Sequence, residues 1–247
     1  MSKPTALPEP LGFPRCPDCA YKLTGAPAIC AACADATLPQ VPAAHCLVCS
    51  QALDGAGTAC GNRICGWPIE QRHFSRVDAV AMYDGVMKQT LPLLKYEGRM
   101  GWALIYGRLI VGWLDNHATH ASDIDVIIGN PTAPDRRPRH VEAIMRAASE
   151  ANRTGRWPFA DPDLPILVKA RATTASAAQG TFWQNKMAAA QEHATALELR
   201  SSVAGQHVLL IDDVFTTGSQ MATVARFLRD QGAAEVRGLV LARAPWR

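Results

Sequence analysis

Two adjacent carboxylates, Asp212 and Asp213, directly follow the apolar run 208–211. The next residues are mostly small or carry hydroxyl groups. Beyond Ser219, apolar residues recur with the spacing of a helix that buries one face. The order is therefore buried strand, acidic pair, small-residue turn and helix. Open α/β sheets bind ligands at the ends of strands in this arrangement, so we expect a ligand site here.

The turn between the acids and the helix is suited to hold a phosphate group. Backbone N–H groups at the start of a helix have no partner inside it, and the helix dipole places about half a positive charge there. Gly218 allows a ligand to approach the backbone closely because it has no Cβ. The segment expected to bind phosphate comprises Val214, Phe215, Thr216, Thr217, Gly218, Ser219 and Gln220.

The acidic pair restricts the rest of the ligand. Carboxylates repel a bare phosphate, but they accept hydrogen bonds from sugar hydroxyl groups and bind divalent cations such as Mg²⁺. A ribose 5-phosphate meets both requirements, with its phosphate in the turn and its hydroxyl groups on Asp212 and Asp213. The competing interpretation is an ordinary strand–turn–helix whose N-terminus is capped by its own side chains.

A second set of chemically active residues lies near the N-terminus. The chain has eight cysteines, all within residues 16–65. They form four closely spaced pairs: Cys16 and Cys19, Cys30 and Cys33, Cys46 and Cys49, Cys60 and Cys65. Two such pairs complete a tetrahedral zinc site that leaves no position for water. We expect two structural zinc sites, one from the first four cysteines and one from the last four, with interleaved pairing as the alternative.

The residues around the cysteines indicate the role of the metal. This segment has few large apolar residues, so metal binding would supply much of its folding free energy. Zinc ribbons often bind nucleic acid, but residues 1–70 carry four basic and five acidic side chains. Zinc thiolate clusters add further negative charge, which is a poor match to a phosphate backbone. This balance favours a structural or protein-contacting role.

Length and composition set the outer limits. A chain of 247 residues with 48% hydrophobic residues has room for one large domain and a smaller one. The net charge of +3 does not by itself indicate nucleic-acid binding. The first residues lack the apolar segment of a signal peptide, and the apolar stretch 102–114 is too short to span a membrane. We expect a cytoplasmic protein without membrane insertion.

The rest of the chain alternates between strand and helix patterns. Strands are expected at 76–84, 123–129, 164–168 and 236–242, and helices at 86–96, 102–114 and 140–152. This alternation predicts an α/β fold with a parallel sheet flanked by helices. We expect a small zinc-ribbon module at residues 1–70 and the α/β domain at residues 71–247.

Residues 208–220 resemble the phosphoribosyl pyrophosphate (PRPP) binding motif of type I phosphoribosyltransferases, although Gln220 stands where that family usually has threonine. Three features together resemble the ComF family of competence proteins. They are the double cysteine module, the segment YDG…LKYEGR, and the C-terminal LLIDDVFTTGSQ…GAAEVRGLVLAR. The resemblance extends over nearly the whole chain.

The resemblance implies a type I phosphoribosyltransferase-like domain that binds PRPP or a related ribose phosphate with Mg²⁺. It also implies a role in handling single-stranded DNA beside DNA-uptake proteins during natural transformation. In an enzyme, pyrophosphate would leave the anomeric carbon, with Asp212 and Asp213 as catalytic residues on the ribose hydroxyl groups. In type I enzymes the loop after strand 123–129 lies near the pyrophosphate. Its candidate residues here are Arg136, Arg137 and Arg139, with a solvated loop as the alternative.

Two further functions stay open. The same fold could serve as a non-catalytic adaptor or ligand sensor that docks partners through the zinc module. A zinc-ribbon nucleic-acid binder is the third possibility. Residues 173–196 resemble the flexible segment that closes over ligand in relatives, and simple surface packing is an equal alternative for them.

Overall fold

A four-stranded parallel sheet forms the centre of the protein. The computed structural model describes residues 38–55, 58–173 and 183–245. The strands lie in the order β1-β6-β5-β2, with bounds β1 (Val77–Met82), β2 (Val126–Gly129), β5 (His207–Phe215) and β6 (Glu235–Arg243). Each neighbouring pair is parallel. The α/β fold with a parallel sheet, predicted from the alternation of strands and helices, is confirmed.

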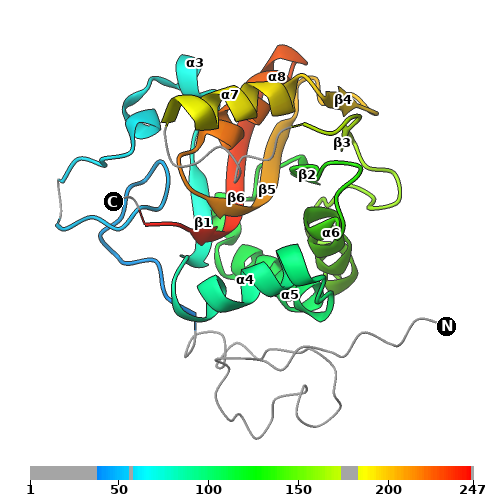
Figure 1. Ribbon diagram of the computed structural model, residues 1–247, viewed down its shortest axis with the longest axis horizontal. Coiled ribbons are helices and arrows are strands. Elements are labelled where there is room, and N and C mark those ends of the chain that lie inside the picture. The colour runs from blue at the N-terminus through cyan, green and yellow to red at the C-terminus, as the bar shows by residue number, and fades with distance from the viewer. Residues whose placement is uncertain (1–37, 56–57, 174–182, 246–247) are drawn as a thin grey trace, which may run out of the picture.

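Helices cover both faces of the sheet (Figure 1). One face carries α4 (Gly85–Glu97), α5 (Gly101–Asn116) and α6 (His140–Ala151). The other carries α3 (Ile69–Arg72), α7 (Trp183–Ala194) and α8 (Ser219–Asp230). Short 3-10 turns occur at η1 (Arg63–Gly66) and η2 (Ala118–His120). Among the described helices, none has the length and apolar character needed to cross a bilayer.

Strand β5 is buried on both faces, which explains its continuous apolar run. Leu209 and Ile211 belong to the core beneath α4, α5 and α6, whereas Val208 and Leu210 belong to the core beneath α8. Because side chains alternate along a strand, every second residue of β5 faces the same set of helices. This alternation determines which elements surround the two carboxylates further along β5.

β5 is longer than the sequence predicts. The expected end of the strand lies at the acidic pair, but the strand continues to Phe215. The ladder with β6 explains this, because it extends to the pairs Val214–Ala242 and Phe215–Arg243. The acids are therefore strand residues whose side chains lie on opposite faces of the sheet.

The strand expected at residues 164–168 forms slightly later and outside the parallel sheet. β3 (Leu167–Lys169) pairs antiparallel with β4 (Leu197–Leu199), an element that the sequence analysis does not predict. A three-residue strand has too little pattern to show its partner, so only the tertiary structure assigns it.

The described part of the N-terminal region lies directly against the sheet. Val77 of β1 donates a backbone hydrogen bond to Val48 at 2.8 Å, and Ser50 Oγ donates to the carbonyl of Val77 at 3.0 Å. Cys49 and Ile64 are fully buried in the same core as α8. Residues 38–55 and 58–70 are thus packed on the α/β domain, and a domain boundary between residues 70 and 71 stays a prediction.

Candidate functional site

The two carboxylates of β5 lie at its C-terminal end and contact different helices. Asp212 faces the α7 side, where Asn130 Nδ2 donates to its Oδ2 at 2.8 Å. Asn130 directly follows β2, the neighbouring strand. His193 of α7 is 3.1 Å from Asn130 Oδ1. Because that oxygen only accepts, His193 Nε2 donates to it, and a hydrogen-bonded chain runs from His193 through Asn130 to Asp212.

Asp213 faces the opposite helices and is buried. Lys95 Nζ, from the last turn of α4, lies 2.5 Å from Asp213 Oδ2. His140 Nε2, at the first residue of α6, donates to the same oxygen at 2.8 Å. A lysine and a histidine therefore hold one carboxylate from two helices.

These contacts separate the pKa values of the two acids. Burial opposes ionisation of Asp213, but the Lys95 ammonium and His140 outweigh it and hold the pKa of Asp213 well below its usual value. Burial and the Asp213 charge raise the pKa of Asp212 above its usual value. Burial also lowers the pKa of His193 to about 3, so this histidine is neutral. The site thus combines a permanently ionised acid with one that accepts protons more readily.

A cavity of about 440 Å³ opens beside the acidic pair. Its lining includes three cationic side chains, from Lys95, Arg136 and Lys169. Lys169 is buried, and its Nζ donates to Thr173 Oγ1 at 2.6 Å. The volume falls in the range of small-molecule sites, and the mixture of acids and cations suits a ligand that carries both hydroxyl and phosphate groups.

A smaller cavity of about 40 Å³ lies next to it and is lined by the turn before α8. The two cavities share Asp212 and Gln220. Within the described residues, the backbone N–H groups of Thr217, Gly218 and Gln220 donate to no backbone carbonyl. Ser219 N donates to Thr217 Oγ1 at 3.3 Å, a long hydrogen bond. Amides at a helix start therefore surround a small hollow beside the acids, as phosphate binding requires.

Gly218 is required for this turn. Its φ is +83°, a backbone angle that residues with a side chain rarely adopt, and Gly218 directly precedes α8. A Cβ here would lie 2.6 Å from Phe215 Cζ. Glycine is expected here so that a ligand can approach the backbone closely. The structure shows that it also lets the turn pack tightly onto the Phe215 ring.

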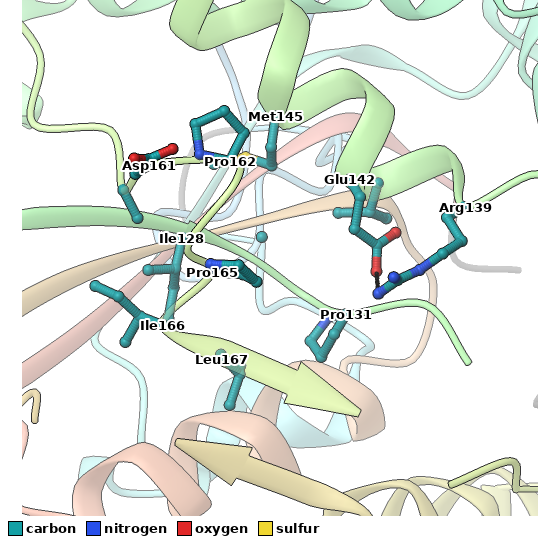
Figure 2. A pocket seen from close by; sticks show the side chains of 13 residues that line it. Ile128, Pro131, Arg139, Glu142, Met145, Asp161, Pro162, Pro165, Ile166 and Leu167 are labelled. Carbon is teal, nitrogen blue, oxygen red and sulfur yellow. Dashed lines mark hydrogen bonds and ion pairs between the residues drawn. The ribbon is translucent and has the colours of Figure 1, made fainter. Parts of the chain in front are cut away.

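The three candidate arginines are placed differently. Arg136 lines the large cavity, with its guanidinium 5.5 Å from the centre of the Tyr96 ring. Arg137 is exposed and donates to the carbonyls of Pro134 and Arg136. Figure 2 shows Arg139 paired with Glu142, at 2.7 Å, on a separate small pocket. Only Arg136 of the three is on the lining of the cavity that contains the acids.

The last four cysteines come together as one cluster. The sulfur atoms of Cys46, Cys49, Cys60 and Cys65 all lie within 4.8 Å of one another. Four thiolates at this separation fit a tetrahedral divalent metal such as zinc, and they leave no open position for catalysis. The four cysteines expected to form the other site, Cys16, Cys19, Cys30 and Cys33, lie outside the described residues.

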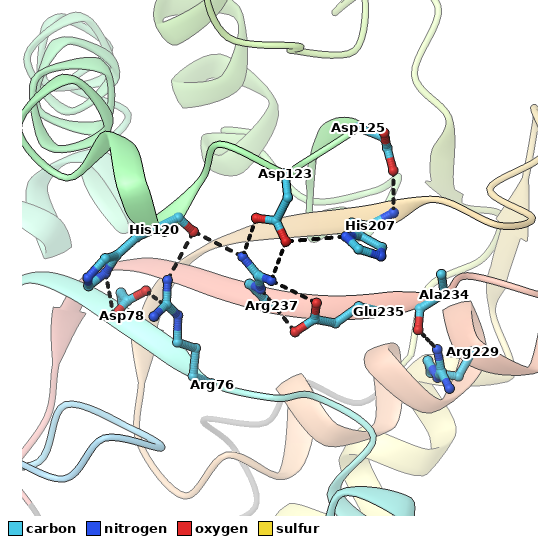
Figure 3. Close-up of polar contacts among 10 residues, drawn as sticks. All are labelled: Arg76, Asp78, His120, Asp123, Asp125, His207, Arg229, Ala234, Glu235 and Arg237. Atoms are coloured by element: carbon cyan, nitrogen blue, oxygen red, sulfur yellow. Dashed lines mark hydrogen bonds and ion pairs between the residues drawn. The ribbon is translucent and has the colours of Figure 1, made fainter.

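A second group of possible metal ligands is already engaged. Asp123, His207 and Glu235 lie close together at the opposite end of the sheet. Figure 3 shows Arg237 between the two carboxylates, with Nη2 2.7 Å from Asp123 Oδ2 and 2.8 Å from Glu235 Oε2. The Arg237 guanidinium occupies the position between the carboxylates that a metal cation would need, so this group is an ion-pair network.

Comparison with known proteins agrees with the geometry of the acidic pair and its turn. Residues 166–246 match the family model described as the phosphoribosyl transferase domain. The matched residues contain β5, the turn and α8. This part of the chain is therefore similar to phosphoribosyl transferase domains.

A second, distant similarity extends over more of the chain. The chain is 28% identical over 213 residues to the DNA utilization protein YhgH of Shigella flexneri, and to those of Escherichia coli O157:H7 and strain K12. Each alignment covers 80% of this chain and 89% of the relative. Among solved structures, phosphoribosylpyrophosphate synthetase from Mycobacterium smegmatis matches with a TM-score of 0.30 and 18% identity, over 56% of this chain and 33% of the other.

Sequence reasoning missed most of the residues that surround the acids. These are Lys95, Asn130, His140, Lys169 and His193. Lys95 lies within the LKYEGR segment, and Asn130 is the first residue after a buried strand, so both positions carried a signal. The two histidines stand in ordinary helical patterns, and nothing in the sequence distinguishes them from surface residues.

Proposed function

We propose that the domain binds a ribose 5-phosphate unit, such as that of PRPP, together with Mg²⁺. The observation that carries this proposal is the small cavity next to Asp212, whose amides have no backbone partner among the described residues and which shares Asp212 and Gln220 with the larger cavity. The 5-phosphate would occupy the turn, and the ribose hydroxyl groups would donate to the acids. Lys169 and Arg136 would neutralise a pyrophosphate group in the large cavity.

Asp212 is the acid better placed to meet the ligand. Asp213 is buried and already holds Lys95 and His140. Asp212 is partly exposed, and among the described residues it accepts only from Asn130 and from the Asp213 amide. The proposed division of roles follows: Asp212 contacts a ribose hydroxyl group or Mg²⁺, and Asp213 fixes Lys95 and His140 at the wall of the cavity.

We also propose transfer chemistry for this site, with displacement of pyrophosphate at the anomeric carbon. No local sequence pattern identifies a general base, but the fold brings His140 to the cavity wall. The Asp213 hydrogen bond orients its ring. His140 Nδ1 is buried and has no hydrogen-bond partner among the described residues, so in the proposed reaction it is the nitrogen that accepts a proton from a nucleophile bound against it.

A non-catalytic function is the second candidate, and one observation favours it. Asp213 is neutralised by Lys95 at 2.5 Å, so the pair does not present two free carboxylates to a ligand. In this case the domain senses a ribose phosphate, and the cysteine module at residues 1–70 docks a partner. The name of the relatives, DNA utilization protein, supports DNA as a partner of this adaptor. The resemblance to the ComF family makes single-stranded DNA and DNA-uptake proteins the proposed partners.

Titration calorimetry of the full-length protein with PRPP and Mg²⁺ tests the binding proposal. We expect saturable binding that Asp212→Asn weakens by tenfold or more, which corresponds to about 1.4 kcal/mol. Asp230→Asn, at the exposed end of α8, is the matched control and should bind as the wild type does. Absence of heat with PRPP in the wild type would refute the proposal.

Pyrophosphate release separates the enzyme from the adaptor. The protein is incubated with PRPP, Mg²⁺ and a panel of nucleobases and nucleosides, and pyrophosphate is measured with a coupled colorimetric assay. Release that His140→Gln reduces, with PRPP binding retained, supports transfer chemistry. Tight PRPP binding without release for any acceptor supports the sensor.

A further inference from the structure

Arg243 lies between the cysteine cluster and the phosphate turn. It is the last residue of β6 and has no exposed surface. Its Nη1 donates to the carbonyls of Phe215 at 3.2 Å and Thr216 at 3.1 Å, and also to that of Ala244. Its Nη2 donates to Cys49 Sγ at 3.6 Å. One guanidinium group therefore bridges two places that the sequence separates by more than 150 residues.

The charge of Arg243 needs an anion that no carboxylate provides. Within the described residues Arg243 forms no ion pair, and its polar partners are carbonyl oxygens and the Cys49 sulfur. A buried cation without a counter-ion is strongly unfavourable. Four thiolates around a divalent metal carry a net charge of −2, so the metal-loaded cluster is the one nearby group that balances it.

The carbonyl contacts also control the turn. In a planar trans peptide the C=O and N–H bonds point in opposite directions. Arg243 holds the carbonyls of Phe215 and Thr216, so it also orients the N–H groups of Thr216 and Thr217 that share those peptide planes. These two residues line the small cavity. The position of the guanidinium is thus transmitted directly to amides that would meet a phosphate.

Packing adds a second connection between the cluster and the turn. Ile64, in the segment between Cys60 and Cys65, is fully buried, and a Cβ on Gly218 would lie 3.0 Å from its Cγ2. The ring of Phe215 lies 5.0 Å from the Arg243 guanidinium. The floor of the turn is therefore built from the metal-binding segment.

We propose that Arg243 is a positioning residue that couples metal binding at Cys46, Cys49, Cys60 and Cys65 to phosphate binding at the turn 216–219. This inference rests on the proposed ribose phosphate binding and adds its regulation. The metal-loaded cluster fixes the guanidinium, the guanidinium fixes the two peptide planes, and the amides are preorganised for phosphate. Loss of the metal removes the counter-ion and releases the turn.

Linkage makes the coupling measurable from the metal side. If the metal raises phosphate affinity by some factor, phosphate must raise metal affinity by the same factor. Couplings of this kind are typically about 5- to 150-fold. We therefore expect ribose 5-phosphate to raise the zinc affinity of this cluster at least fivefold, as roughly the lower end of that range.

The experiment is a zinc competition with a chromogenic chelator, on the full-length zinc-loaded protein, with and without saturating ribose 5-phosphate. A second zinc site is expected at Cys16, Cys19, Cys30 and Cys33, so only the release phase altered by Cys60→His is scored. Arg243→Met should abolish the effect of ribose 5-phosphate on zinc release. Arg243→Lys should restore little of it, because the donors of an ammonium lie on one nitrogen, whereas Arg243 reaches the carbonyls from Nη1 and the sulfur from Nη2.

Arg237→Met is the matched control, because Arg237 is on the same strand but binds carboxylates at the far end of the sheet (Figure 3). It should lower stability and leave the coupling unchanged. If Arg243→Met does not fold, Cys60→His provides the test. With three thiolates and one neutral histidine it keeps a zinc site but lowers the net charge of the loaded cluster from −2 to −1. The effect of ribose 5-phosphate on zinc affinity should then fall.

The outcomes separate this inference from the proposal beneath it. Binding of ribose 5-phosphate with unchanged zinc affinity overturns the coupling and leaves the proposed function standing. Equal coupling in Arg243→Met or in Cys60→His overturns the role of Arg243 and of the cluster charge, respectively. No binding of ribose 5-phosphate to the zinc-loaded wild type overturns both proposals.

Discussion

At the scale of single residues, the acidic pair is divided between two environments. Asp213 is held by Lys95 and His140, whereas Asp212 is linked to a neutral histidine through Asn130. Two carboxylates adjacent in the chain therefore have different protonation behaviour, because successive strand residues face opposite sides of the sheet. The difference allows one acid to organise the cavity wall while the other meets a ligand.

Replacement of Lys95 by methionine should be strongly destabilising. The change leaves the buried Asp213 carboxylate without its ammonium partner, which typically costs about 3 kcal/mol or more. Urea denaturation at pH 7 measures the free energy of unfolding. Lys88→Met, at an exposed position of the same helix, is the control and should change stability by less than about 0.5 kcal/mol. Equal effects of the two substitutions would contradict the ion pair.

His193 should make the protein less stable in mild acid. Burial lowers the pKa of His193 to about 3 in the folded state, against about 6.5 in the unfolded chain. The unfolded state therefore binds the proton first, and stability is lost as the pH falls below about 6.5. The expected loss between pH 7 and pH 5 is about 2 kcal/mol.

His193→Gln, which keeps an N–H donor toward Asn130, should remove that part of the pH dependence. Denaturation curves at pH 7 and pH 5 provide the measurement, and the exposed His117→Gln serves as the control. A wild-type pH dependence in His193→Gln would show that the histidine does not remain neutral in the fold.

At the scale of elements, the turn between β5 and α8 depends on the packing beneath it. The sequence pattern predicted a small-residue turn, and the structure shows that Gly218 of this turn is buried against Phe215 and Ile64. The amides are thus held in place by a hydrophobic floor. A rigid floor under unpaired amides is what preorganised anion binding requires.

Gly218→Ala separates backbone strain from this packing. A Cβ at Gly218 meets Phe215 Cζ at 2.6 Å, whereas at Gly205, which has a similar φ of +74°, a Cβ meets nothing within 4 Å. Gly205→Ala should therefore lose about 1 kcal/mol, from backbone strain alone. Gly218→Ala should lose about 2 kcal/mol more and also bind ribose 5-phosphate at least tenfold more weakly. Calorimetric titration and denaturant unfolding of both variants test the difference.

At the scale of the whole molecule, the cysteine cluster is part of the domain core. Cys49 and Ile64 share a hydrophobic core with β5 and α8, and Arg243 joins the cluster to the turn. A metal bound here would stabilise more than a peripheral ribbon, because the residues that it would order also cover the sheet.

Removal of zinc should therefore weaken the α/β domain itself. We expect a chelator to lower the midpoint of thermal unfolding by roughly 10 °C or more, given the free energy of structural zinc sites. Circular dichroism of the sheet and helices follows this transition. A domain that melts at an unchanged temperature after zinc removal would show that the cluster and the core are independent.

The sequence by itself determined the parallel sheet, the acidic pair with the turn that follows it, and the cysteines that form the described cluster. These features depend on local patterns: apolar periodicity, adjacent acids before a small-residue turn, and short cysteine spacings. Such patterns survive in the fold because neighbouring residues remain neighbours.

Only the tertiary structure decided which residues complete the site. Lys95 is 118 positions from Asp213, and His140 is 73 positions from it, so no local pattern relates them. The sequence also did not predict the antiparallel pairing of β3 with β4 or the contacts by which Arg243 bridges the cysteine cluster and the turn. The physical reason is the same in each case: a buried charge is placed by the packing of elements distant in the chain, and only the folded structure brings its partners within hydrogen-bonding distance.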